Sequence, residues 1–239
     1  DIYNLYQFDR ELKACIYPIL ENIELTLRAK IAYYLGKSTG IHGYLNPIYF
    51  NNLQHHKKSK ENFLKAKSRD KRKRYSLVRH HESIYTDELP VYKAVELFTL
   101  GELTKLYDNI KDNGIKKDIM QEFISRERKL TVKIFRSWII RLTDIRNVCA
   151  HYDILWNRKF ELMPLRNQYW KNLAISNVTN NKYYSLFTIL IIFKILTLNG
   201  KLFGDFMNRL DIIFNENKLI IKPVDMGFPV KWKSEIQRY

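Results

Sequence analysis

Glycine is scarce in this chain, with eight residues among 239. Loops that cradle phosphate groups need closely spaced glycines, because only glycine lets the backbone approach the phosphate. The sequence has neither the P-loop pattern GxxxxGKS/T nor GxGxxG, and it also lacks the HExxH, GxSxG and paired CxxC motifs. These absences argue against kinases, P-loop NTPases and Rossmann enzymes.

Cysteine is nearly absent as well: the two present, Cys15 and Cys149, both lie in apolar contexts that favour helix. They cannot cross-link a chain of this size into a disulfide scaffold, and no secretory signal pattern is found, so we expect a reduced, cytoplasmic protein with buried thiols. The sequence begins at Asp1 rather than Met, so we also expect a further segment upstream in a longer reading frame.

Long hydrophobic runs are missing too. The most apolar stretch, residues 186–198, is too short to span a bilayer core of about 30 Å, and it contains Lys194. We therefore expect a buried core helix here and no membrane segment. Attachment to a membrane surface through basic residues is disfavoured, because no amphipathic apolar face accompanies them.

Acidic residues are few relative to basic ones: 25 Asp and Glu face 41 Lys and Arg, for a net charge of +16. With 46% hydrophobic and 14% aromatic residues the chain is not a disordered polycation. Such a charge on a folded body predicts polyanionic partners, with nucleic acid first and an anionic membrane surface second. A general compositional bias toward Lys, Asn, Ile and Tyr is the alternative interpretation.

Apolar residues at three- and four-residue steps predict an all-α protein. A helix over residues 5–35 should be kinked or split at Pro18, and the strand-like run over residues 218–224 is an exception to the helical pattern. We expect one domain over residues 1–215 and a C-terminal extension, 216–239, that packs on it. Further helices are predicted over 90–98, 102–110, 115–123, 130–150, 183–199 and 203–214, a helical or linker region over 52–85, and irregular structure over 153–181.

The densest charge feature is the basic segment, residues 55–81, whose net charge of +9 comes from eleven basic and two acidic residues. Its cations could contact RNA phosphates, while Phe63 and Tyr75 could stack on bases; a solvated helix face or a linker is the alternative. Two His pairs occur here, but no Cys or carboxylate stands at ligand spacing, so we expect no metal and no cofactor. The expected RNA-binding residues are Lys57, Lys58, Lys60, Lys65, Lys67, Arg69, Lys71, Arg72, Lys73, Arg74 and Arg79.

A second candidate site lies at the end of the helix predicted over residues 130–150, where Arg146, Asn147 and His151 follow an apolar stripe. RNA supplies its own nucleophile, the 2′-hydroxyl, so its cleavage needs a proton-transferring group, a cation for the phosphoryl oxygens and an orienting donor. His, Arg and Asn fit these three tasks. On a regular helix Arg146 is roughly 140° from His151, so both serve one site only if the Arg side chain wraps round, the helix is distorted or a second subunit contributes. Alternatively, Arg146 pairs with Asp144 or Glu96, and His151 stabilises the helix end.

The run IRNVCAHYDILWNR (145–158) closely resembles the signature of the Abi-like (AbiD/AbiF) family of phage abortive-infection proteins, a branch of the HEPN superfamily. Other segments agree in order: YQFDRELK (6–13), ENIELTLRAKIAYYL (21–35), LPVYKAVELFTLGELTKLY (89–107), and MGFP with Trp232 near the end. The resemblance implies a HEPN-like helical bundle. It also implies a metal-independent endoribonuclease in which Arg-x4-His motifs from two protomers form one cleft, hence a homodimer.

Carried over by position, the motif residues are Arg146, Asn147 and His151. A common family variant has a second His where this chain has Tyr152, so Tyr152 is a supporting candidate, as is Glu96 in the matched VELFTLGEL run. Some relatives associate with a small non-coding RNA.

Two hypotheses of different class follow from the sequence. In the first, the protein is a HEPN ribonuclease toxin of phage defence, regulated by a partner or small RNA. In the second, it is a non-catalytic protein that forms a complex with a structured non-coding RNA, and its positive charge serves to bind that RNA.

Overall fold

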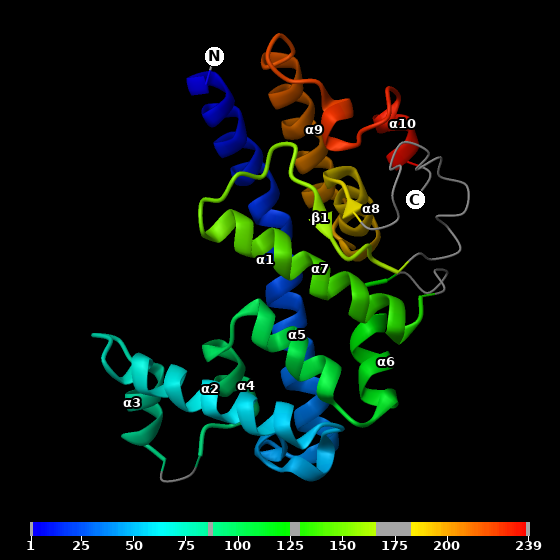
Figure 1. Cartoon of the computed structure of the whole chain (residues 1–239). Helices are drawn as coiled ribbons and strands as arrows, with labels where there is room; N and C mark the ends of the chain where they lie inside the picture. Colours follow the sequence, from blue (N-terminus) through cyan, green and yellow to red (C-terminus); the bar gives the residue numbers. More distant parts are fainter. Residues whose placement is uncertain (1, 86–87, 125–129, 166–182, 238–239) are drawn as a thin grey trace. The chain divides into compact units, whose positions relative to one another are not determined.

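The computed structural model describes residues 2–85, 88–124, 130–165 and 183–237, and within them it is almost wholly helical (Figure 1). The α-helices are α1 (Ile2–Thr39), α2 (Leu53–Lys71), α3 (Leu77–Glu82), α4 (Val91–Ala94), α5 (Leu100–Asn109), α6 (Asn113–Gln121), α7 (Val132–Ala150), α8 (Leu186–Leu196), α9 (Gly200–Glu216) and α10 (Trp232–Ile236). Short 3₁₀ helices lie at Gly43–Leu45, Pro47–Tyr49, Val95–Leu97 and Pro223–Met226. The two-residue strands β1 (Phe160–Glu161) and β2 (Tyr183–Tyr184) pair antiparallel. The predicted all-α class is confirmed.

The chain forms two compact units, which we call unit 1 (residues 1–23 and 123–239) and unit 2 (residues 24–122). Helix α1 contributes its first part to unit 1 and the remainder to unit 2. The expected C-terminal extension, 216–239, belongs to unit 1. Its treatment as an extension of one domain stays a prediction, and part of the expected irregular region, residues 166–181, lies outside the described residues.

Helix α1 runs from Ile2 to Thr39 with Pro18 inside it, so of the two outcomes expected at Pro18 the split is wrong and the kink stays a prediction. Proline removes one backbone donor from the helical ladder. The helix continues because its neighbours are fixed by packing: Ile16 and Ile19 on either side of Pro18 are both buried. Burial of an apolar face thus offsets the local cost of the missing hydrogen bond.

Unit 1 has an apolar core built on α7, α8 and α9. Every residue of α8 except Lys194 is buried, as the predicted core helix requires. Among the described residues, no helix is long and apolar enough to cross a bilayer. At the C-terminal end, the Trp232 ring packs edge-on against Phe214 and Phe228.

The strand predicted over residues 218–224 is wrong: the chain makes a turn here and then a 3₁₀ helix that begins at Pro223. This helix ends at Gly227, whose φ of 82° and close approach to Ser185 exclude a side chain. The apolar run therefore folds into a tight turn in place of an extended strand.

Unit 2 is organised around α2, which contacts α5, α3 and the 3₁₀ turn after α4. Phe63 of α2 packs edge-on against Tyr44 and Phe98 and is buried. Asn52 caps α2 by accepting the His55 N–H at 2.9 Å. Because Phe63 lies in the core, the base-stacking role expected for it is wrong.

Candidate functional site

Helix α7 presents the motif residues because its opposite face is held in the core. Thr131 caps its N-terminus through the Ile134 N–H, and Trp138, Leu142 and Ile145 are fully buried. A helix with one buried stripe turns its remaining positions outward. Its predicted range over residues 130–150 agrees with the observed Val132–Ala150.

The C-terminus of α7 ends in a Schellman-type turn. The His151 N–H donates to the Asn147 carbonyl at 2.9 Å, and the Asp153 N–H donates back to the Val148 carbonyl at 3.1 Å. Between them Tyr152 has φ of 58°, the left-handed region in which a non-glycine residue is strained. The turn exposes His151 and Tyr152 directly after the last helical residue.

The three motif residues differ in exposure: Asn147 and His151 are exposed, and Arg146 is half-buried. The His151 N–H still bonds four residues back, so the chain follows the helical path as far as this residue. The angle of roughly 140° between Arg146 and His151 expected for a regular helix therefore persists.

The segment after the motif is anchored by Asp9 and Lys13 of α1. The Asp9 carboxylate accepts the Leu155 N–H at 2.8 Å and the Trp156 N–H at 2.6 Å. Lys13 pairs with Asp9 at 2.8 Å and donates to the Asp153 carbonyl at 3.0 Å. A buried carboxylate with this set of donors fixes the path of the chain that follows His151.

Sequence reasoning assigned no role to Asp9 or Lys13. Asp9 directly follows Phe8, on the apolar stripe that continues to Leu12, and it is itself buried. The sequence did contain a signal for this role: an acidic residue on an apolar helix stripe is expected to be buried, and a buried carboxylate needs hydrogen-bond or charged partners.

Cys149 lies beside the motif, and its thiol is partly withdrawn from solvent. Burial, opposed in part by Lys13 and Arg146, raises the pKa of the Cys149 thiol to about 11. A thiol with this pKa is protonated at neutral pH, and the thiolate is the reactive form.

Two acidic residues considered as partners of Arg146 have other contacts. Asp144 pairs with Arg141 at 3.2 Å, one turn earlier on α7. Glu96 belongs to unit 2, where it pairs with Arg28 at 3.2 Å. The supporting roles of Glu96 and Tyr152 stay predictions.

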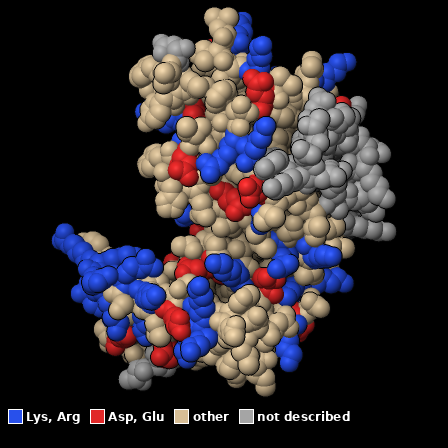
Figure 2. Space-filling model, viewed as in Figure 1, with Lys and Arg blue, Asp and Glu red and all other residues tan. Residues whose placement is uncertain are grey.

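The basic segment forms α2, a turn and α3, and blue atoms gather over this part of unit 2 in Figure 2. Some of its cations are used within the fold. Lys67 pairs with Glu82 and Glu88, and Lys71 pairs with Glu82 at 2.8 Å. Lys73 pairs with the buried Asp70 at 3.0 Å. Lys67 and Lys71 thus join α2 to α3, and Lys73 pairs with the end of α2 from within the turn.

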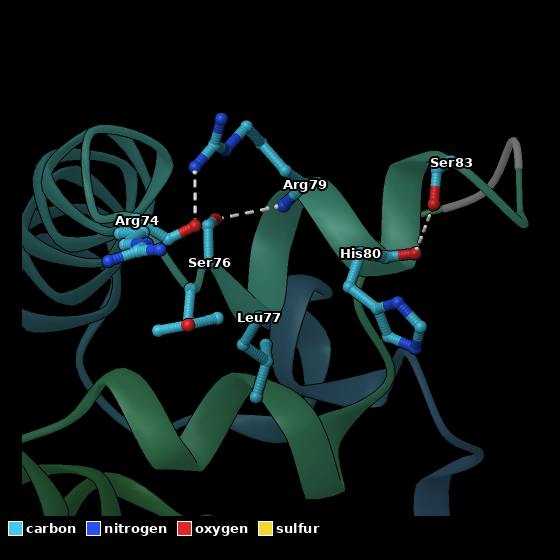
Figure 3. A pocket seen from close by; sticks show the side chains of 7 residues that line it. Arg74, Ser76, Leu77, Arg79, His80 and Ser83 are labelled. Atoms are coloured by element: carbon cyan, nitrogen blue, oxygen red, sulfur yellow. Dashed lines mark hydrogen bonds between the residues drawn. The ribbon is translucent and has the colours of Figure 1, made fainter.

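Arg79 has a similar structural position. Figure 3 shows its guanidinium reaching back to the Arg74 carbonyl, at 3.1 Å, and it also donates to the Lys73 carbonyl. The Arg79 N–H donates to the Ser76 hydroxyl, which caps α3, at 3.0 Å. This turn borders an open, shallow cavity of about 570 Å³ that is also lined by Tyr75 and His80.

Other cations of the segment form no ion pair with the residues that the structure describes. They are Lys57, Lys58, Lys60, Lys65, Arg69, Arg72 and Arg74, and all are exposed. Arg74 lies over the ring of the exposed Tyr75, 5.4 Å from its centroid. The structure thus separates the predicted RNA-binding residues into a paired group and a group open to solvent.

The two His pairs are each divided between core and surface. His56 is buried, stacks on Phe50 at 4.5 Å between ring centroids and bonds to the Tyr44 carbonyl, whereas His55 is exposed. His81 is buried and stacks on Tyr85. Within the described residues no three His, Cys, Asp or Glu side chains are grouped so that they could hold a metal ion.

An all-helical fold that exposes Asn147 and His151 at a helix end, together with an open cationic helix, is compatible with a protein that acts on RNA. The family model described as Abi-like protein matches residues 1–157, a range that includes the basic segment and the motif. The chain therefore belongs to the Abi-like family of abortive-infection proteins. Neither the curated proteins nor the solved structures give a match to this chain.

Proposed function

We propose that this protein is a HEPN endoribonuclease that acts in phage defence and cleaves RNA without a metal ion. The observation that supports it most is the end of α7, where His151 and Asn147 are exposed beside the half-buried Arg146. Membership of the abortive-infection family gives the biological setting.

In the proposed reaction, the 2′-oxygen of the RNA attacks the adjacent phosphorus and the bond to the 5′-oxygen breaks. The products are a 2′,3′-cyclic phosphate and a 5′-hydroxyl. His151 removes the proton from the 2′-hydroxyl, and an imidazolium returns a proton to the leaving oxygen. Arg146 stabilises the charge on the phosphoryl oxygens, and Asn147 orients the phosphate or the imidazole.

Two motifs are proposed to meet across a homodimer. A single imidazole is needed first as a base and then as an acid, and two facing His151 side chains would divide these tasks. A second protomer also removes the constraint of the roughly 140° between Arg146 and His151 on one helix. Asp9 and Lys13 are positioning residues in this scheme, because they fix the chain after His151 without belonging to the motif.

A second candidate function is favoured by the open cations of α2. A protein that only binds a structured RNA would use Lys65, Arg69 and Arg72, which have no ion pairs in the described structure, and would leave the motif unused. Cleavage, not binding, separates the two functions.

A cellular experiment tests the proposal. Expression of the wild-type protein should be toxic or should block phage growth, whereas R146A and H151A should do neither at equal protein levels. E21Q, which changes an exposed residue on α1, is the matched control and should behave as wild type. Toxicity that survives in both R146A and H151A would support the binding function instead.

A further inference from the structure

Unit 2 contains a cavity of about 240 Å³ between α2 and α5. Its floor is formed by Phe50, His56 and Leu106, which are buried. Its rim on the α2 side is formed by His55, Lys58 and Asn62. The cavity therefore combines a buried, largely aromatic floor with a polar rim that carries both signs of charge, Lys58 and Lys105 together with Glu102 and Asp108.

The floor is held rigidly. The Phe50 and His56 rings stack, His56 bonds to the Tyr44 carbonyl at 3.0 Å, and Phe50 forms a β-bridge with Ile110. The neighbouring Asn109 side chain exchanges two hydrogen bonds with the Asn52 backbone, at 2.8 and 3.0 Å. A ligand would thus meet a preformed surface, which lowers the cost of ordering on binding.

The cavity continues into a groove along α2. A second cavity of about 490 Å³ is lined by Lys65, Arg69 and Arg72, and it shares Asn62 and Glu102 with the first. Lys58, Asn62, Lys65, Arg69 and Arg72 are spaced by four and three residues, which places them on one face of the helix. We call this face the α2 stripe.

The charges on the two sides of the groove differ. The α2 stripe is cationic and unpaired within the described residues, whereas α5 contributes Glu102, Lys105 and Asp108. Glu102 is already committed to the α5 cap, because it accepts the Thr99 N–H at 2.8 Å. The groove therefore favours a ligand with an anionic backbone, which would lie along α2 and direct its attached groups toward the cavity.

We propose that this groove binds single-stranded RNA, with phosphates along the α2 stripe and one unstacked base in the cavity between α2 and α5. Ligand pockets for drug-sized molecules have roughly 300–1,000 Å³, so 240 Å³ suits a single planar base better than a whole cofactor. Proteins read unpaired RNA by combining a basic groove with pockets for splayed bases, which a duplex cannot supply. The inference deepens the proposed function by naming the class of RNA that it binds.

Fluorescence anisotropy with a labelled single-stranded RNA and the matching duplex tests the inference. S59W fills the cavity from its α2 rim without changing charge, and Q54W places the same side chain on the exposed start of α2, outside the cavity. We expect S59W to weaken single-strand binding about tenfold, the order of one lost base contact, and to leave duplex binding unchanged. Q54W should bind both RNAs as wild type does.

A thiouridine-containing RNA cross-linked to the wild-type protein gives a readout that requires no variant to fold. The label should map to residues 50–62 or 102–109. Equal single-strand affinity of S59W and wild type, or cross-links confined to other regions, would overturn the inference. Nucleoside monophosphate that competes as well as the RNA strand would also overturn it, in favour of a free nucleotide as the ligand.

Failure of this inference is distinguishable from failure of the proposed function. If S59W binds normally but H151A does not cleave, the pocket is wrong and the nuclease stands. If S59W weakens single-strand binding but H151A still cleaves, the pocket stands and the assigned catalytic residue is wrong.

Discussion

Asp9, near the start of the chain, contacts the segment that follows the motif. Its carboxylate accepts two backbone N–H groups and pairs with Lys13, and all of these groups belong to unit 1. At the residue scale the site is thus defined by a buried acid and its donors as much as by Arg146, Asn147 and His151.

Asp9→Asn removes the charge while keeping the shape of the side chain. We expect a loss of about 1.5–3 kcal/mol of unfolding free energy, because the two backbone N–H groups then donate to a neutral amide oxygen and Lys13 loses its carboxylate partner. Urea unfolding followed by circular dichroism measures this, with E21Q as the control.

The same variant separates positioning from stability. At a temperature where D9N is fully folded, its kcat for RNA cleavage should fall while its KM stays close to that of wild type. A normal kcat in folded D9N would show that Asp9 stabilises the fold without positioning the motif.

Asp70 gives a pH-dependent prediction. Burial opposes its ionisation, but the Val78 N–H, Lys73 and Ser76 outweigh burial and lower the pKa of Asp70 below its ordinary value of 3.8. A carboxyl with a lowered folded-state pKa contributes stability above its unfolded pKa, and this contribution is lost as the pH falls through the folded value.

We therefore expect wild type to be more stable than Asp70→Asn at pH 7, with the difference shrinking below about pH 3.8. Urea midpoints measured at several pH values test this, with Glu61→Gln, an exposed neutralisation on the same helix, as the control. A wild-type advantage that persists undiminished at pH 2 would contradict the role given to the carboxylate.

At the scale of elements, α2 has two cationic faces with different uses. Lys67 and Lys71 face acidic residues and hold the α2–α3 hairpin, whereas the α2 stripe lines the groove. A charge count over the basic segment does not separate these faces, because partners such as Glu82 and Glu88 are brought to α2 only by the fold.

Replacing Lys65, Arg69 and Arg72 together by Ala should weaken RNA binding and flatten its salt dependence. Each phosphate neutralised on a single strand contributes about 0.7 to the log–log slope, so the slope should decrease by about 2. The matched control replaces Lys201, Lys218 and Lys222, which are exposed cations of unit 1, and it removes the same charge. Equal losses in both triple variants would show that RNA binding follows net charge and not the groove.

The helices could be predicted from the sequence where a buried apolar stripe dominates. Helix α7 and the core helix α8 were located in this way, because their periodicity reflects the faces that they bury. The pattern did not decide between a kink and a split at Pro18, where the helix continues because residues on both sides are packed. It failed at residues 218–224, where Pro223 and Gly227 make a tight turn.

The candidate site could be predicted only in part. Chemistry and spacing pointed to Arg146, Asn147 and His151, which follow one another at the end of α7, and their catalytic roles stay predictions. The contacts of Asp9 with Leu155 and Trp156 join residues almost 150 positions apart, and a local pattern holds no information on such pairing. The cavity between α2 and α5 was missed for the same reason.

At the scale of the whole molecule, more than half of the net charge of +16 lies in the basic segment, residues 55–81, which forms α2 and α3. The α2 stripe lies in unit 2 and the motif lies in unit 1, and the family match includes both. The proposed homodimer would bring two motifs together, and the charged surface would gather the RNA substrate.

The most direct test is cleavage of one end-labelled RNA in the presence of EDTA by wild type, R146A, H151A and E21Q. Wild type and E21Q should cut it and leave a 2′,3′-cyclic phosphate. H151A should be slower by about 10²- to 10⁴-fold, the usual contribution of a positioned proton-transfer group, and R146A by about 10²- to 10³-fold, the contribution of one electrostatic stabiliser. Cleavage at the wild-type rate by both R146A and H151A would contradict the central claim.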